Sequence, residues 1–211
     1  AGIIQFNDLI ALKKANRAQV ENKIVYLSQA LVRHKTGDNY ATVVHNRNRG
    51  AIEAAKLGAS AIIIRSVGTG ISRYAHTGAT YYSKSVNKIP AAAISTADAE
   101  QLDRILAYGQ PVRLALTINA SEKQWQESYN VIGEITGSEA ENEVIVLAAH
   151  LDSWDLGKGA IDNGFGVGVV MSAAHLVKQI GQPKRTIRVI LFASEEVGLK
   201  GAKAYTQTHL K

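Results

Sequence analysis

The sequence contains 211 residues, of which 46% are hydrophobic and 20% charged, and it has no cysteine. These values are typical of a globular protein with one large domain or two small ones. The lack of cysteine excludes disulfides and thiolate metal sites and leaves the cellular compartment open. The net charge is +6, and residues 1–125 hold 16 Lys/Arg against 8 Asp/Glu. Because these cations are scattered, we expect a solvated basic surface and no nucleic-acid partner.

Membrane and export signals are also missing from the residues given. The longest apolar runs are short strand-like pieces, so no run reaches the length of a membrane span and we expect no membrane partner. The opening residues, AGIIQFNDLI, lack the basic and apolar regions of a signal peptide. A mature or trimmed chain would look the same, so the compartment stays open.

The first part of the chain alternates predicted helices and strands, with one long interruption. That interruption, Val67–Lys88, is rich in Gly, Ser, Thr and Tyr, and a loop of this length is more often functional or mobile than idle. Helical spacing of apolar residues, caps and β-branched runs predict the other elements. They are a helix over 8–20, a strand over Lys23–Ser28, a helix over Arg49–Gly58, a strand over Ala59–Ser66, a strand over 91–94, a helix capped by Ser95 or Thr96 that ends near Gly109, and an alternating strand over Pro111–Asn119.

The pattern of predicted elements and the charge balance change in the last part of the chain. We therefore place a boundary near Ser121–Gln124, which gives domains 1–122 and 123–211. Continuous apolar strands separated by a helix predict a βαβ unit on a parallel sheet. The predicted elements are strands over Trp125–Gly137, Glu143–Ala149 and Arg185–Ser194, and helices over Gly164–Ile180 and Leu199–His209.

Polar residues gather where two of these strands end. His150 follows one strand, Glu195 and Glu196 follow the next, and Asp162 lies just before the crossover helix. A right-handed crossover makes the two strands neighbours or near neighbours, and the carboxyl ends of parallel strands form the usual ligand edge. We therefore expect one imidazole and several carboxylates to converge there.

Such a cluster favours a divalent metal, because crowded carboxylates repel one another unless a cation compensates them. Imidazole and carboxylate ligands suit catalytic zinc, or less often manganese or cobalt. Asp162 has two oxygens and could bridge two ions, whereas Asp152 could hold the second nitrogen of His150. In an extended segment Glu195 and Glu196 would point to opposite sides, so that one ligates metal while the other takes a proton from water. The glycines around this loop allow positive φ angles and a close approach of the backbone.

Each of these patterns also has an ordinary explanation. A histidine and an aspartate two residues apart often form a surface pair, and paired glutamates at a helix start often compensate the helix dipole. Trp154 could line a cleft or simply pack. No role is assigned to Asp155 or His76, and the structural explanation is preferred for Asp155.

At this stage the sequence resembles a known family. The segments AAHLDSWDLGKGAIDNGFG and FASEEVGLKGAKAY are similar to those of the di-zinc exopeptidases, the aminopeptidase and glutamate carboxypeptidase family. RGAIEAAKLGASAIIIRSV and NKIPAAAISTADAEQL resemble the protease-associated domain inserted in such enzymes. The resemblance implies an α/β fold: a partial, mixed but mainly parallel catalytic sheet in 123–211, plus an inserted protease-associated α/β domain in 1–122.

By resemblance, His150 ligates one zinc, Asp162 bridges both ions and Glu196 ligates the other. Glu195 would be the general base, Asp152 would orient His150, and the Asp162–Asn163 peptide bond would be cis. The implied function is a zinc-dependent exopeptidase with two ions per complete site, acting on small peptides or dipeptides. Secretion or a periplasmic location and a possible homodimer are implied in the same way.

The family also has two further metal ligands, an acid and a histidine, in later strands, and this sequence ends before either could occur. We therefore expect the chain alone to bind metal poorly and to hydrolyse little. Two rival interpretations remain. The chain could be a non-catalytic protein-binding module of the same architecture, or a metal-dependent hydrolase of another bond.

Overall fold

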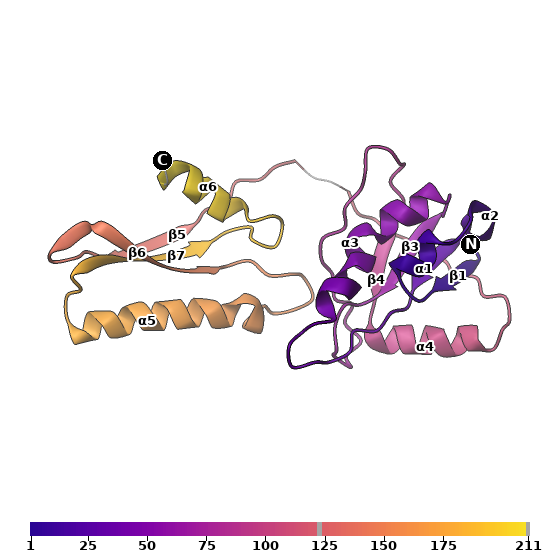
Figure 1. Cartoon of the computed structure of the whole chain (residues 1–211), viewed down its shortest axis with the longest axis horizontal. Coiled ribbons are helices and arrows are strands. Elements are labelled where there is room, and N and C mark those ends of the chain that lie inside the picture. The colour runs from indigo at the N-terminus through magenta and orange to yellow at the C-terminus, as the bar shows by residue number, and fades with distance from the viewer. Residues whose placement is uncertain (122–123, 210–211) are drawn as a thin grey trace. The chain divides into compact units, whose positions relative to one another are not determined.

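The computed structural model describes residues 1–121 and 124–209, and it divides the chain into two compact units, Ala1–Ser121 and Glu122–Lys211. The predicted domain boundary at residues 122 and 123 lies outside the described residues. Both units are of the α/β class, as predicted, and each is best considered by itself (Figure 1). Whether the first unit is an inserted protease-associated domain stays a prediction.

The first unit is a four-stranded parallel sheet with strand order β1-β2-β3-β4. Helix α4 packs on one face of the sheet, against Tyr26 and Ile63, whereas α1, α2 and α3 pack on the other face, against Val25 and Ile62. Strand residues are buried on both faces, which explains why β2 and β3 read as continuous apolar runs. The elements are β1 (Ile3–Phe6), α1 (Leu9–Lys13), α2 (Arg17–Val20), β2 (Ile24–Leu27), α3 (Tyr40–Lys56), β3 (Ala61–Arg65), β4 (Ala91–Ile94) and α4 (Thr96–Ala107).

The sequence expectations for this unit differ from the structure at four places. The helix expected over 8–20 is two short helices, because Asn16 caps a new helix with its side chain and forms a capping box with Gln19. Strand β1 was not anticipated. The helix expected over Arg49–Gly58 begins already at Tyr40, as α3. The strand expected over Pro111–Asn119 does not form, since only Arg113 makes a bridge, to Gly2.

The second unit is a three-stranded sheet with order β5-β7-β6, in which β6 is parallel and β5 antiparallel to β7. The predicted pairing of the two strands that carry the polar residues is therefore confirmed. Helix α5 runs along one face of this sheet and α6 lies on the other (Figure 1). The elements are β5 (Val131–Ile135), β6 (Ala140–His150), a π-helical turn η1 (Ala160–Phe165), α5 (Gly166–Ile180), β7 (Arg185–Phe192) and α6 (Lys200–His209).

The helical stretch Ala160–Ile180 has the length and mean hydropathy (1.3) of a membrane span. Only 6% of its most apolar part is buried. The regular part, α5, is only 15 residues long, because Asp162 and Asn163 have non-helical backbone angles. A span needs about 20 helical residues. Helix length therefore argues against a span, and the predicted absence of a membrane partner stays a prediction.

Candidate metal centre

The site lies where β6 and β7 end side by side. His150, the last residue of β6, pairs in register with Phe192, the last residue of β7, and the N–H of Leu151 donates to the Phe192 carbonyl at 2.8 Å. Each strand then continues into a loop that carries acidic residues. Parallel pairing therefore brings the segments after residues 150 and 192 to one edge of the sheet.

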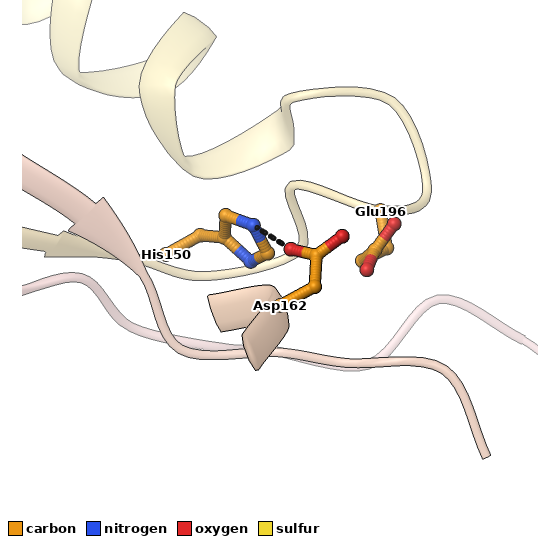
Figure 2. A group of neighbouring side chains, drawn as sticks. All are labelled: His150, Asp162 and Glu196. Atoms are coloured by element: carbon orange, nitrogen blue, oxygen red, sulfur yellow. Dashed lines mark ion pairs between the residues drawn. The ribbon is translucent and has the colours of Figure 1, made fainter. Parts of the chain in front are cut away.

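Three predicted ligands meet at this edge. One donor atom from each of His150, Asp162 and Glu196 lies within 4.8 Å of the other two. The Nε2 atom of His150 is 3.0 Å from Oδ1 of Asp162. Figure 2 shows the imidazole directed at the Asp162 carboxylate, with the Glu196 carboxylate on the far side of Asp162. The imidazole is largely buried, at 13% exposure, whereas Asp162 is 74% exposed.

The loop that carries Asp162 has two unusual backbone features. The peptide bond between Asp162 and Asn163 is cis, as the family resemblance implied. Gly159 before it has φ +62°, where an added Cβ would lie 2.6 Å from the Ser153 hydroxyl, so only glycine fits comfortably. Of the glycines around this loop, at positions 157, 159, 164, 166 and 168, Gly159 alone has a positive φ angle.

Asp152 contacts the site in a way that the sequence did not predict. The Nδ1 atom of His150 lies 2.9 Å from the backbone carbonyl of Asp152 and 3.6 Å from its carboxylate. The carboxylate instead accepts the backbone N–H of Glu195 at 2.9 Å and that of Glu196 at 3.1 Å. Asp152 therefore joins the loop after β6 to the loop after β7, while its carbonyl oxygen orients the imidazole.

Glu195 and Glu196 lie in a turn and not in the extended segment that we expected. Ser194 before them has φ +55°, which bends the chain immediately after the strand. The Oε2 atom of Glu195 is 3.9 Å from Nε2 of His150, so its carboxylate also approaches the cluster. Both glutamates therefore contribute to one site, although the geometric reason given from sequence was wrong.

The ionised form of Glu196 is disfavoured at this site. Burial raises the pKa of the Glu196 carboxyl above its usual range, and the nearby charge of Asp162 raises it further. A hydrogen bond from the Trp154 side chain acts in the opposite direction. With Nδ1–H directed at the Asp152 carbonyl, Nε2 of His150 faces the Asp162 carboxylate, and a cation can satisfy both.

Sequence reasoning missed two contributors. The sequence left two roles open for Trp154, lining a cleft or packing, and did not predict its hydrogen bond to Glu196. Asn130, which precedes β5, was not singled out, yet its side chain bonds to the turn that holds the glutamates.

Two residues were left without a role from the sequence. Asp155 is exposed in the loop after β6, and the backbone N–H of His76, in the first unit, donates to the Ser66 hydroxyl at 2.8 Å.

Comparison with known proteins finds similarity to peptidases. Residues 130–211 match the model of Peptidase family M28. Over its whole length the chain is similar to a crystal structure of a peptidase M28 precursor from Shewanella amazonensis, with TM-score 0.93 and 42% identity, covering 100% of this chain and 48% of that one. The chain is thus similar to M28 peptidases.

Among individual proteins, the similarity is to carboxypeptidase Q. The enzyme from Xenopus laevis is 41% identical over 195 residues, and the one from Homo sapiens is 39% identical over 193. These matches cover 92% and 91% of this chain and 40% of each relative, so the chain spans about two fifths of their length. A zinc aminopeptidase from Bacillus subtilis shares the fold, with TM-score 0.56 and 24% identity, over 100% of this chain and 45% of that one.

Proposed function

We propose that the protein is a zinc-dependent exopeptidase that hydrolyses terminal peptide bonds of small peptides, with its metal held by His150, Asp162 and Glu196. The observation that carries the proposal is the convergence of these three donor atoms within 4.8 Å, at the paired ends of two parallel strands. The similarity to carboxypeptidase Q and to M28 peptidases supports the same reaction class.

The donor set fits zinc. One imidazole and two carboxylates, without thiolate, form the type of ligand set that catalytic zinc uses, and the carbonyl of Asp152 fixes the ring nitrogen that does not face the metal. In the proposed arrangement His150 and Glu196 would each hold metal, and Asp162 between them would be the shared ligand. When bound, zinc supplies Lewis-acid chemistry that polarises the peptide carbonyl and lowers the pKa of water.

Glu195 is proposed as the general base. Its carboxylate is 35% exposed and lies 3.9 Å from His150, so it borders the cluster and remains open to solvent. It can accept a proton from the attacking water and return it to the amine that leaves when the peptide bond breaks. Asp152 holds the backbone of Glu195 and so fixes where that proton transfer takes place.

The assay uses the protein at the length of its relatives, because the chain spans 40% of them. Dipeptides and peptides blocked at one or the other end are incubated with and without added Zn²⁺. We expect zinc-dependent release of terminal residues, and we expect Glu195→Gln to lower kcat about 10²–10⁴-fold while zinc content stays unchanged. Equal activity in Glu195→Gln would contradict the role of that residue.

The rival interpretation, a non-catalytic binding module, predicts a well-folded protein that releases no amino acid and holds no zinc. The donor cluster at the end of β6 argues against it. Secretion or a periplasmic location, a homodimer, and a protease-associated domain in residues 1–122 remain proposals that rest on similarity to the family.

A further inference from the structure

We propose that Asn130 is a positioning residue for the metal site, because its side chain fixes both ends of the turn that presents Glu195 and Glu196. Asn130 immediately precedes β5, on the opposite side of β7 from His150. It touches none of the ligands. The part of the inference that concerns metal binding rests on the proposed function. The part that concerns the turn does not, because the turn belongs to the described fold.

The turn runs from Ala193 to Gly201 and is closed by its own backbone. The N–H of Gly201 donates to the Ala193 carbonyl at 2.9 Å, and the N–H of Lys200 donates to that of Ser194 at 3.0 Å. Inside it, Gly198 and Leu199 both donate to the carbonyl of Glu195, at 2.9 and 2.8 Å. The path of the two glutamates is therefore set by where this turn begins and ends.

Asn130 binds both of those ends. Its Oδ1 accepts the N–H of Ala193 at 3.0 Å, and its Nδ2 donates to the carbonyl of Gly201 at 2.9 Å. The assignment of the two amide atoms is unambiguous, because the N–H of Ala193 can only donate and the carbonyl of Gly201 can only accept. One side chain thus uses one acceptor and one donor to hold two residues that flank the glutamates.

The fit around Asn130 is close. A Cβ added to Gly201 would lie 2.2 Å from Oδ1 of Asn130 and 2.5 Å from the Ala193 carbonyl, so the turn has room only for glycine. Asp152 holds the same turn from the other side, through the N–H groups of Glu195 and Glu196. The glutamate backbone is therefore fixed from two different loops before any metal binds.

The chain offers a matched control at the opposite end of β7. The hydroxyl of Thr186 accepts the N–H of Gly137 at 3.0 Å and donates to the carbonyl of Glu141 at 2.7 Å. Like Asn130, it bridges one backbone donor and one backbone acceptor, but it does so far along the strand from the glutamates. Asn130→Ala and Thr186→Val therefore each remove two such bonds, and only the first affects the turn.

Two measurements on the protein at the length of its relatives test the proposal. The first is hydrogen exchange of the Glu195 and Glu196 amides in metal-free protein, which we expect to speed up at least about 10-fold in Asn130→Ala and to stay slow in Thr186→Val. The second is Zn²⁺ affinity by chelator competition, with Co²⁺ absorption as a reporter of ligand geometry. We expect affinity to fall about 10–100-fold and the Co²⁺ spectrum to change in Asn130→Ala alone.

Asn130→Asp provides a milder variant if the alanine substitution prevents folding. It keeps the acceptor for Ala193 and loses the donor to Gly201, so an intermediate exchange rate is expected. Unchanged exchange in both Asn130 variants, or equal changes in Thr186→Val, would overturn the positioning role. Failure of the wild-type protein, at the length of its relatives, to bind Zn²⁺ would instead count against the proposed function, while the exchange experiment would still decide the role of Asn130.

Discussion

The carboxylate of Asp152 accepts the backbone N–H of Glu195 at 2.9 Å, and so joins two loops that are 43 residues apart in the sequence. A second bond, from the N–H of Glu196, uses the other oxygen. A carboxylate offers an acceptor on each oxygen, so both bonds depend on its not being replaced by an amide. The position of the glutamates relative to His150 therefore depends on Asp152, which connects the loop after β6 to the loop after β7.

Asp152→Asn tests that relation. The amide group would place N–H donors against a backbone N–H, so one of the two bonds is lost and the glutamate turn loosens. We expect Zn²⁺ affinity to fall about 10–100-fold, which is the usual effect of changing a group that holds metal ligands. Chelator competition measures this, and Glu139→Gln, which removes an exposed carboxylate near the other end of the sheet, should leave affinity unchanged.

Trp154→Phe should weaken the site without unfolding it. The substitution keeps an aromatic ring and removes the N–H that donates to the Glu196 carboxylate. We expect a loss of Zn²⁺ affinity of about 1 kcal/mol, the typical net value of a hydrogen bond, or roughly fivefold. Trp125→Phe is the control, since Trp125 is 85% exposed and contacts Lys200 and not a ligand. An equal effect of the two substitutions would refute the role of Trp154.

Two glycine substitutions should change stability in opposite directions. Gly159→Ala forces a side chain into φ +62° and against the Ser153 hydroxyl, so the free energy of unfolding should fall by about 1–2 kcal/mol. Gly168→Ala lies in α5 with no atom within 4 Å of the added Cβ, and should raise it by about 0.5–1 kcal/mol. Denaturant titration of both variants checks the signs, and a Gly159→Ala chain as stable as wild type would contradict the first.

The first unit should lose stability in alkali through Tyr26. Its side chain is fully buried, and burial together with the charge of Asp103 raises the pKa of the Tyr26 phenol well above its ordinary value near 10. The phenol therefore ionises first in the unfolded chain, so its stabilising effect is complete below pH 10 and is lost as the pH rises from there toward the folded pKa. The free energy of unfolding should fall by up to about 1.4 kcal/mol per pH unit.

Tyr26→Phe is the comparison for the alkaline experiment. It removes the ionisable hydroxyl and keeps the ring, so its unfolding free energy should decline less steeply above pH 10 than that of the wild-type chain. Denaturant titrations of both proteins between pH 8 and 11 measure the two slopes. Identical slopes would show that ionisation of Tyr26 does not cause the loss of stability at high pH.

Much of the site could be predicted because the signals were local. His150, Asp162 and Glu196 each follow or precede an apolar element, and parallel pairing of β6 and β7 brings them together. The relation of Asn130 to Ala193 and Gly201 could not be predicted, because nothing near Asn130 in the sequence indicates which backbone groups its amide meets. Long-range bonds of this kind depend on the final register of the sheet.

The errors in the fold have similar causes. The expected strand over Pro111–Asn119 alternates in sequence, but after Gly2 meets Arg113 no partner strand continues the ladder in the described structure. Residues 8–20 have helical spacing throughout, and the cap at Asn16 still divides them. In both places a local pattern was correct about side-chain burial and wrong about hydrogen bonding.

The most direct test of the central claim is a Zn²⁺ titration with a competing chelator, on the protein at the length of its relatives. The proteins compared are wild type, His150→Ala, Asp162→Ala and Glu196→Ala, with His175→Ala as the control. We predict that wild type and His175→Ala bind with the same affinity and that each of the other three loses at least about 10-fold, because each removes one of the three converging donors. Equal binding by all five proteins would contradict a metal centre at this sheet edge.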